Sequence, residues 1–397
     1  MSPWSEAALA DVCRIVGGGT PSRSNADFYG GSIPWITPKD MKVWEISGAQ
    51  VSITQAGLDN SATRLVPADS VLIVVRSGVL KHTVPVALSR VPAAINQDMK
   101  ALLCGNRVVP AFLARFIKAQ SPAILKWVRA TTADNFPIDN LKALTVPLPP
   151  LPEQKRIAAI LDKADEMRAK RRAALAELDT LAQSIFLEMF GDPVANPKGW
   201  PETACLGEVA DIVSGVTKGR KLNGRSAREV PYLAVANVQD RALNLSAVKT
   251  IEATEEEIER YRLERDDLLL TEGGDPDKLG RGTLWSEELP ECIHQNHVFR
   301  VRLTTSTVQP LFLNWLVGSQ RGKKYFLRSA KQTTGIASIN MTQLRGFRLL
   351  VPPVSLQRTF AAGVAAVEKL TAAHRASLAE LDALFASLQH RAFRGEL

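Results

Sequence analysis

The stretch "LAELDTL" (residues 175–181) returns almost unchanged as "LAELDAL" (residues 378–384). The similarity extends outward on both sides. "PPLPEQKRIAAILDKADEMRAKRRAALAELDTLAQSIFLEMFG" begins at Pro149, and "PPVSLQRTFAAGVAAVEKLTAAHRASLAELDALFASLQHRAFRG" begins at Pro352. Self-similarity at a fixed offset is typical of a duplicated architecture. The chain therefore carries one long segment twice.

Each copy of this segment has the pattern of a long helix with an apolar seam. Apolar residues recur at seven-residue steps, at Ile157, Ala164, Leu178 and Ile185 in the first copy and at Phe360, Val367, Leu381 and Leu388 in the second. This pattern predicts a coiled coil in which the two copies pair with each other, because each seam finds a near copy of itself. The first helix leads into the second half of the chain and the second must return, so we expect them to be antiparallel. About 38 helical residues would span about 57 Å.

The segments that precede the two helices also match, more weakly. "LADVCRIVGG" (9–18) is similar to "LGEVADIVSG" (206–215), and "INQDMKAL" (95–102) to "IHQNHVFRV" (293–301). Short β-branched runs between Gly, Pro and Asn predict strands, with about one helix per segment. We therefore expect an α+β protein of two similar mixed α/β domains joined by the antiparallel coiled coil, with pseudo-two-fold symmetry. The expected boundaries are 1–145 (head one), 146–191 (first spacer helix), 192–350 (head two) and 351–397 (second spacer helix).

The net charge of +8 comes from 49 Lys and Arg against 41 Asp and Glu. The excess is largest in residues 1–152, which hold 15 basic and 10 acidic side chains. Basic surface of this kind suits a polyanion such as DNA, although an ordinary basic soluble protein would show the same charge. No apolar run is long enough to span a membrane, no export signal is recognisable, and the four cysteines are scattered. These features predict a cytoplasmic protein.

Three short motifs resemble catalytic or metal-binding patterns without completing them. "GSQRGKK" (318–324) is shorter than a P-loop and lacks its Ser or Thr, and "ANPKGW" (195–200) lacks the second Pro and the aromatic residue of an adenine-methylase motif. In "CIHQNH" (292–297), strand alternation would turn His297 away from Cys292 and His294, which disfavours zinc. We therefore predict a chain without catalytic activity, bound metal or cofactor of its own.

Four stretches resemble the specificity subunit of type I restriction–modification enzymes: "GGGTPSRSNADFYGGSIPWITPKDM" (17–41), "RSG" (76–78), "INQD" (95–98) and "VPLPPLPEQKRIAAILD" (146–162). The resemblance covers the full length. It implies two target-recognition domains that each read one half of a split double-stranded DNA sequence in the major groove, while the helices set the unread gap. It also implies docking of two copies of an adenine methyltransferase subunit, which would hold S-adenosylmethionine, and in some complexes of ATP-dependent restriction and translocase subunits. Head two departs from the pattern because it lacks the GGTPS-type loop, and the second helix lacks the "PEQ" form.

Candidate DNA contacts are the polar and charged residues of glycine-rich loops, since such loops approach a backbone closely and Arg, Gln and carboxylates can recognise base edges. In head one they are Thr20, Ser22, Arg23, Lys39, Asp40, Arg76, Ser77, Lys81 and Gln97. In head two they are Lys218, Arg220, Lys221, Arg225, Glu272, Asp275, Lys278, Arg281, Gln295 and Lys331. Gln97 and Gln295 align in the sequence repeat. Solvated loops, helix caps or other structural roles remain alternatives for each residue.

The candidate partner-binding residues lie where the long helices begin, and they are Pro152, Gln154, Arg156, Gln357 and Arg358. Two other functions stay open on the sequence alone. One is a recognition subunit of another methylation-linked phage-defence system, with similar heads and different enzymes. The other is a scaffold whose paired domains bind protein rather than DNA.

Overall fold

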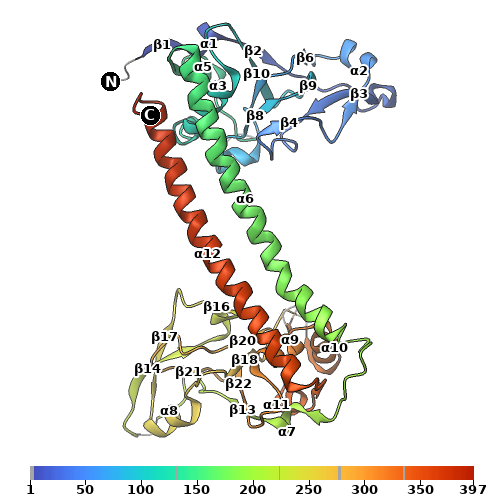
Figure 1. The fold of residues 1–397 in the computed structure, drawn as a ribbon, viewed down its shortest axis with the longest axis vertical. Coiled ribbons are helices and arrows are strands. Elements are labelled where there is room, and N and C mark those ends of the chain that lie inside the picture. Colours follow the sequence, from blue (N-terminus) through green and yellow to red (C-terminus); the bar gives the residue numbers. More distant parts are fainter. Residues whose placement is uncertain (1–3, 130–132, 223, 276–278, 334–335) are drawn as a thin grey trace. The chain divides into compact units, whose positions relative to one another are not determined.

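The computed structural model describes residues 4–129, 133–222, 224–275, 279–333 and 336–397. The chain forms two compact units, of which the first comprises residues 1–173 and 375–397 and the second residues 174–374. Each unit contains one head and half of each long helix (Figure 1). The units thus divide both helices near their middles, whereas the boundaries expected from the sequence separate helices from heads.

Head one contains two main sheets. The larger has the order β2–β10–β7–β8–β4, with β2 (Cys13–Gly17), β10 (Met99–Cys104), β7 (Ser70–Val74), β8 (Val86–Ser89) and β4 (Glu45–Ile46). The second has the order β5–β3–β9–β6, with β5 (Ser52–Ile53), β3 (Tyr29–Ile36), β9 (Ala93–Ile95) and β6 (Leu65–Val66). β1 (Ser5–Ala8) pairs with β11 (Thr145–Leu148). The helices are α1 (Leu9–Val12), α2 (Gln55–Asp59), α3 (Pro110–Ala119), α4 (Ser121–Leu125) and α5 (Ile138–Lys142), with short 3₁₀ turns η1 (Ala26–Phe28) and η2 (Gly78–Lys81).

The apolar run "VLIVV" forms the centre of head one because both faces of its strand are covered. Successive side chains of a strand point to opposite faces. Val71 and Ile73 of β7 belong to a core with Phe112 of α3, while Leu72 and Val74 belong to a separate core on the other face of the sheet. A continuous apolar run is what such a two-sided strand requires.

Head two repeats this arrangement. Its larger sheet has the order β13–β22–β18–β20, with β13 (Ala210–Ser214), β22 (Val298–Leu303), β18 (Leu268–Thr271) and β20 (Gly282–Leu284). A second sheet has the order β17–β14–β21, with β17 (Lys249–Ala253), β14 (Arg228–Leu233) and β21 (Ile293–His294). β12 (Ala204–Cys205) pairs with β25 (Arg348–Leu349), and β15 (Val238–Gln239) with β16 (Ala242–Leu243). A third sheet joins β19 (Gly273–Gly274), β24 (Ile336–Ser338) and β23 (Lys331–Thr333). The helices are α7 (Leu206–Val209), α8 (Glu255–Tyr261), α9 (Pro310–Val317), α10 (Gln320–Ser329) and α11 (Met341–Arg345), with the turn η3 (Val235–Asn237).

The strand register shows which residues of the two heads are structurally equivalent. The parallel pair Ile36–Ile95 of head one corresponds to Leu233–His294 of head two. The residue after this pair bonds in the same way in both heads. The amide of Asn96 donates to the carbonyl of Ile36, and the amide of Gln295 donates to the carbonyl of Leu233. Gln295 is therefore equivalent to Asn96, and the sequence-based equivalence of Gln97 and Gln295 is wrong by one residue. The cause is that equivalent residues of this segment are 199 apart, as Ile95 and His294 are, whereas Gln97 and Gln295 are 198 apart.

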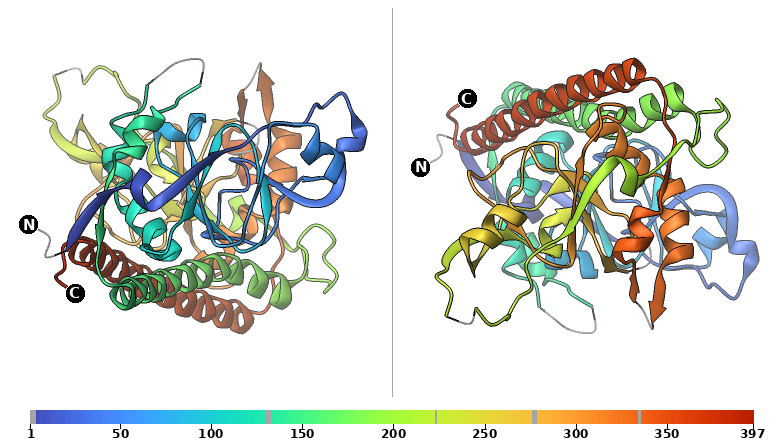
Figure 2. Two further views of the ribbon diagram at one scale, coloured as in Figure 1. Left: turned by 90° about the horizontal axis from the view of Figure 1, so that it is seen from above. Right: turned by 90° about the horizontal axis from the view of Figure 1, so that it is seen from below.

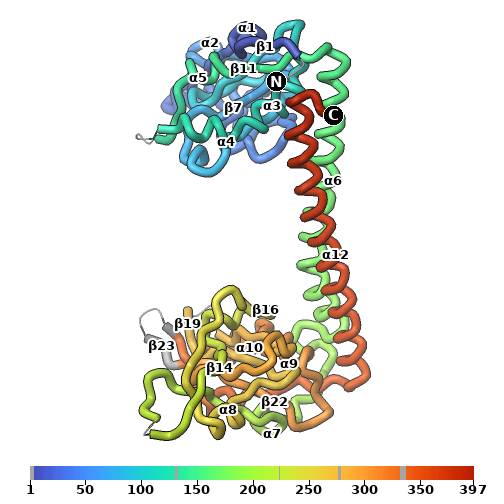
Figure 3. The backbone as a smooth tube through the Cα atoms, turned by 90° about the vertical axis from the view of Figure 1, so that its left-hand side faces the viewer, coloured from blue at the N-terminus to red at the C-terminus, as the bar shows by residue number. Residues whose placement is uncertain are grey.

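The two long helices are α6 (Leu151–Phe190) and α12 (Val354–Ala392). In the first unit, Arg156 near the start of α6 donates to the carbonyl of Leu397 at 3.0 Å, and Arg168 binds Asp382 at 2.6 Å. Residue numbers rise along one helix as they fall along the other, so these halves are antiparallel (Figure 2). Phe393 packs on Phe112 of α3, which brings the C-terminal segment back to head one (Figure 3). The expected helix direction is confirmed.

The second unit joins its halves of α6 and α12 through aromatic packing. Phe186 and Phe190 of α6 contact Phe360 of α12, with ring centroids 5.5 and 5.4 Å apart. The late part of α6 thus lies beside the early part of α12, which is again antiparallel. Trp315 of α9 packs on Phe360 and ties head two to the helices. The predicted fold class, two similar mixed heads with antiparallel long helices, is confirmed.

A pair of buried glutamines fixes the start of each long helix against its head. Gln154 accepts from the amide of Val109 and donates to the carbonyls of Arg107 and Pro149. Gln357 accepts from the amide of Gln309 and donates to the carbonyls of Thr307 and Pro352, all within 3.1 Å. In both cases the amide belongs to the residue that precedes the N-terminal proline of α3 or α9. We call this arrangement the glutamine clasp.

No helix among the described residues is long and apolar enough to cross a membrane.

Candidate nucleic-acid interface

The loops that hold most candidate contacts of head one meet at one edge of its sheets. β2 ends at Gly17 opposite Lys100, β7 ends at Val74 opposite Met99, and β10 begins at Met99. β3 ends beside the end of the parallel strand β9. The segments that continue from these ends are residues 18–25, 37–40, 75–81 and 96–98, and we call them together the loop edge of head one.

Head two builds the same edge from the ends of β13, β18, β21 and β22, since Ser214 lies opposite Phe299 and Thr271 opposite Val298. The described part of its loop edge comprises residues 215–222, 224–227, 272–275, 279–281 and 295–297. The strand pair β24–β23 joins this edge through β19, where Gly273 lies opposite Ser338. Most segments that the sequence singled out separately are therefore brought together, once in each head.

Close backbone packing explains one glycine in each loop edge. A Cβ atom on Gly18 would lie 2.0 Å from the carbonyl oxygen of Ile95, and one on Gly215 would lie 1.9 Å from that of His294. The following amides, of Gly19 and Val216, donate to those same carbonyls. Only glycine allows this approach. The backbone of the loop edge is thus conserved between the heads by geometry, while the side chains on it differ.

In head one, three of the candidate residues lie in a cluster of two separate side-chain pairs around the turn 96–98. Thr20 donates through its hydroxyl to the side-chain carbonyl of Gln97. Arg76 Nε lies 2.5 Å from Asp98 Oδ1, with half of the Arg76 side chain exposed. Asp98 is held in turn by Asn96, which is buried and bonds both its backbone amide and its carboxylate. The cluster presents polar side chains on a rigid turn.

The other candidates of head one divide into exposed side chains and turn residues. Ser22, Arg23, Lys39 and Lys81 are exposed, and Lys81 Nζ lies 4.0 Å from Asp134. Ser77 caps the turn η2. Asp40 accepts from the amide and hydroxyl of Thr37 and from the amide of Gln50, all at 2.8–2.9 Å. Asp40 therefore stabilises its own turn, and its role in base reading stays a prediction.

The basic loop of head two, within residues 215–228, has fewer unpaired cations for binding DNA than its charge suggests. Arg220 binds Glu257, and Arg228 binds Glu255 and Glu291. Arg225 lies 3.7 Å from Glu256. Helix α8 thus supplies acids that the sequence places far from the loop. Hydrogen bonding to Arg220 lowers the pKa of Glu257, which keeps the carboxylate charged.

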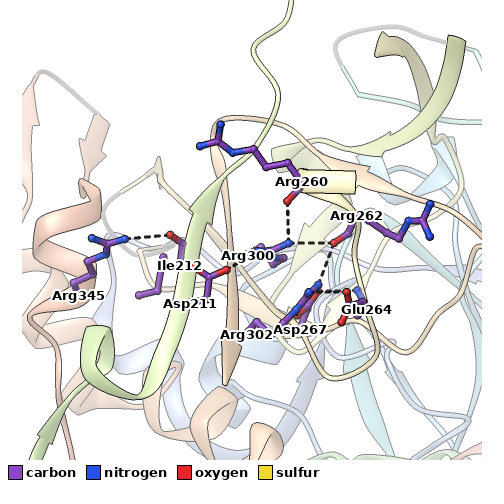
Figure 4. A network of polar contacts seen from close by, with 9 residues as sticks. All are labelled: Asp211, Ile212, Arg260, Arg262, Glu264, Asp267, Arg300, Arg302 and Arg345. Carbon is purple, nitrogen blue, oxygen red and sulfur yellow. Dashed lines mark hydrogen bonds and ion pairs between the residues drawn. The ribbon is translucent and has the colours of Figure 1, made fainter. Parts of the chain in front are cut away.

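Arg220 therefore anchors the loop to α8, while Arg225 is 68% exposed and its role as a DNA contact stays a prediction. Lys218 and Lys221 remain exposed on the loop. A second group of arginines in head two is similarly neutralised: Arg300 binds Asp211 at 2.7 Å, and Arg302 binds Asp267 and Glu264 (Figure 4). The basic surface of head two is consequently smaller than a count of its arginines indicates.

The remaining candidates of head two lie around β19. Glu272 Oε2 is 2.5 Å from His297 Nδ1, and both side chains are partly exposed. Arg281 donates to the side chain of Gln239 at 3.2 Å. Asp275 is exposed, Gln295 is half-buried, and Lys331 begins β23. Lys278 lies outside the described residues.

His294 shows why "CIHQNH" is not a metal motif. Cys292, Ile293 and His294 are all buried, and His297 is exposed because it lies in the turn between β21 and β22 rather than by strand alternation. Burial lowers the pKa of His294 to about 4, so the ring is neutral at pH 7, and its Nδ1 bonds the carbonyl of Val298 at 2.7 Å. No group of three or more His, Cys, Asp or Glu among the described residues is placed to hold a metal ion.

The candidate partner-binding residues at the helix starts separate into two kinds. Pro152, Arg156 and Arg358 are exposed. Gln154 and Gln357 are fully buried in the glutamine clasps, with their amide groups bonded inside the chain. The prediction that these glutamines bind a partner is therefore wrong. A signal was present in the sequence, because a glutamine five residues after the first proline occurs in both copies.

Comparison with known proteins agrees with this architecture. Residues 1–178 and 197–383 match the family described as type I restriction modification DNA specificity domain. The EcoR124I/EcoR124II specificity subunit of Escherichia coli is 38% identical over 40% of this chain and 40% of that protein. The MjaIX specificity subunit of Methanocaldococcus jannaschii is 26% identical over 59% of this chain and 58% of that protein, so these two matches span about half of each relative. The StySPI subunit of Salmonella potsdam is 23% identical over 99% of this chain and 89% of that protein.

Solved structures share the fold over the whole length. The S subunit of a type I restriction-modification system from M. genitalium aligns with a TM-score of 0.58 at 16% identity, covering 99% of this chain and 96% of that chain. A chain from a study of the assembly and conformational transition of the type I R-M system aligns with a TM-score of 0.62 at 18% identity, covering both chains completely. With the family match on both halves of the sequence, the chain belongs to the family of type I restriction modification DNA specificity domains.

Proposed function

We propose that this chain is the DNA-recognition subunit of a type I restriction–modification complex, in which each head reads one half of a bipartite double-stranded target. The observation that carries the proposal is the duplicated loop edge. Two heads hold equivalent loops on equivalent strand ends, and the polar side chains on these loops differ. A rigid shared backbone with variable hydrogen-bonding groups suits two readers of different sequences.

The long helices set the unread gap between the half-sites in this proposal. A straight α-helix of 40 residues, as in α6, extends about 60 Å, longer than one turn of B-DNA at about 34 Å. The exposed residues Pro152, Arg156 and Arg358 are placed at the starts of α6 and α12. We assign these two surfaces to the docking of two adenine methyltransferase subunits, to which ATP-dependent restriction and translocase subunits can be added.

The chemistry in this proposal belongs to the partners. The methyltransferase subunits hold S-adenosylmethionine, and this chain contributes recognition without catalysis, in the cytoplasm. Target methylation then depends on both components.

The deciding experiment maps methylated adenines in cells that express this chain with its methyltransferase. The expected result is one bipartite motif, and exchange of residues 1–145 for head one of a relative changes one half of the motif and leaves the other half intact. A control exchange of 192–350 changes the other half. Simultaneous change of both halves by either exchange contradicts the proposal, and a complex without salt-sensitive affinity for DNA indicates a protein-binding scaffold instead.

Helix length offers a second test. Four residues inserted near Ala173–Ala176 in α6, with a matching insertion beside His374 in α12, add about 6 Å. At 3.4 Å per base pair, the gap lengthens by about two base pairs while both half-sites stay unchanged. A control with four substitutions at the same positions keeps the original gap. Retained methylation with an unchanged gap removes the role of the helices as spacers.

A further inference from the structure

At the same turn, the two loop edges carry hydrogen-bonded side-chain pairs in which the acid and its partner exchange places. Asp98 and His297 are structurally equivalent, since the amides of Val75 and Glu272 donate to their carbonyls at 2.9 and 3.0 Å and β10 and β22 begin immediately after them. In head one this turn residue is an acid that binds Arg76. In head two it is a histidine that binds Glu272, which stands one position before the counterpart of Arg76.

The ion pair in head one leaves a fixed donor group. Asp98 engages Nε of Arg76, and among the described residues the two Nη atoms have no hydrogen-bond or ion-pair partner. Asp98 is itself held by the buried Asn96, so the guanidinium is oriented on a rigid base. Half of the Arg76 side chain is exposed. Two neighbouring N–H donors in a fork match the O6 and N7 acceptors of guanine in the major groove.

The hydrogen-bonded pair in head two leaves an acceptor instead. His297 engages one carboxylate oxygen of Glu272, and Oε1 has no hydrogen-bond or ion-pair partner among the described residues. The backbone of Glu272 is fixed on both sides, because its amide donates to His297 and its carbonyl accepts from Ile339 at 2.9 Å. A carboxylate oxygen held in this way accepts from the N4 amino group of cytosine.

We infer that Arg76 and Glu272 are specificity-determining residues, Arg76 reading a guanine in one half-site and Glu272 a cytosine in the other, with Asp98 and His297 as their positioning residues. This inference rests on the proposed function. It assigns different bases to the same turn of the two heads, and it explains why the turn keeps its backbone while its charges change.

The test uses the complex of this chain with its methyltransferase partner and a random double-stranded DNA library, with bound sequences read before and after selection. For Arg76→Gln, the preference for guanine at one position of one half-site falls roughly tenfold or more, and adenine gains because a glutamine side chain pairs with it. For Glu272→Gln, the same shift from cytosine toward adenine occurs in the other half-site. The gap and all other positions stay unchanged.

Matched controls separate base reading from charge. Arg90 is an exposed arginine of head one with ion pairs to Glu45 and Asp69, away from the loop edge, and Arg90→Gln leaves the motif intact. Glu287, paired with Arg265, serves in the same way for head two. Thermal unfolding of each variant checks the fold. If Arg76→Gln unfolds, Arg76→Lys replaces it, since lysine keeps the charge and loses the fork.

Two results overturn the inference. One is an unchanged base preference in a folded Arg76 or Glu272 variant. The other is uniform weakening across all library sequences, which identifies a phosphate contact rather than a base contact. A wild-type complex that selects no bipartite motif contradicts the proposed function itself, so the two failures are distinguishable.

Discussion

Head one and head two each contain an arginine stacked on a tryptophan, but the two residues have exchanged positions between the heads. In head one, Arg115 of α3 lies over the ring of Trp44, 3.8 Å from its centroid. In head two, Arg241 lies over the ring of Trp315 of α9 at 3.6 Å. The helix contributes the cation in one head and the aromatic ring in the other. A cation over an aromatic face is favourable whichever element supplies each part, so duplication followed by divergence preserves the contact and not the residues.

The glutamine clasps show the opposite behaviour, because Gln154 and Gln357 make the same three bonds. Their acceptors and donors are backbone groups, which cannot diverge with sequence. Comparison of the heads therefore separates two kinds of position. A residue that hydrogen-bonds backbone groups is the same in both heads. Residues that contact each other through their side chains differ between the heads as a pair.

The largest expected effect breaks a clasp. Gln154→Ala leaves one buried amide and two carbonyls without partners, and we expect a loss of about 3 kcal/mol or more in the free energy of unfolding. Gln357→Ala should cost the same in its unit. Urea denaturation measures both, and the neighbouring exposed variant Lys155→Ala should have almost no effect. A clear difference between the two glutamines would show that the clasps are not energetically equivalent.

The exchanged cation–aromatic pairs should differ in strength. Arg115 is almost fully buried and also binds Asp162 and Asp165, so Arg115→Ala should cost about 3 kcal/mol. Arg241 has the aromatic contact as its main partner, and Arg241→Ala should cost about 1–2 kcal/mol. Denaturant unfolding compares them, with exposed Arg107→Ala as a control. Equal costs would indicate that the two acids add nothing to the contact in head one.

The stability of head two should depend on pH through His294, whereas its equivalent in head one, Ile95, does not titrate. The pKa of His294 is lowered to about 4 in the folded protein, so the unfolded chain binds a proton first as the pH falls. Stability contributed by the neutral ring is present at pH 7 and is lost between pH 6.5 and 4, about 2 kcal/mol by pH 5. His294→Ile should remove this dependence, whereas exposed His82→Gln should not. Unfolding midpoints at pH 7 and 5 provide the measurement, and an unaltered pH slope in His294→Ile would refute the assignment.

The smallest expected effect concerns the contact between the long helices in the first unit. Asp382 binds Arg168 and Arg172 on α6 but is 44% exposed. Solvent weakens such pairs, so Asp382→Asn should cost no more than about 1 kcal/mol and the cost should fall further in high salt. Exposed Glu177→Gln is the control. A cost above 2 kcal/mol would mean that this pair, and not apolar packing, holds the helices together.

The sequence predicts the repeats, the long helices and their direction because these depend on periodic patterns spread over many residues. It also locates most segments of the loop edges. It does not predict which residues are equivalent across the turn, since the offset between the heads is 197 from Val74 to Thr271 but 199 from Ile95 to His294. Nor does it predict that Arg220, Arg225 and Arg228 bind the acids of α8, which lie about thirty residues further along the chain. Local charge is visible in a sequence, whereas its neutralisation is a tertiary property.

The discontinuity of the first unit has a consequence for biosynthesis. Arg156 bonds Leu397, 241 residues away, and the core of this unit includes Ala392, with Phe393 packed against it. The second unit uses only the continuous stretch 174–374. During translation, domains generally fold in the order in which they emerge from the ribosome. Here we expect the reverse. The first unit cannot complete its fold, and part of its apolar surface stays exposed, until residues 375–397 have been synthesised.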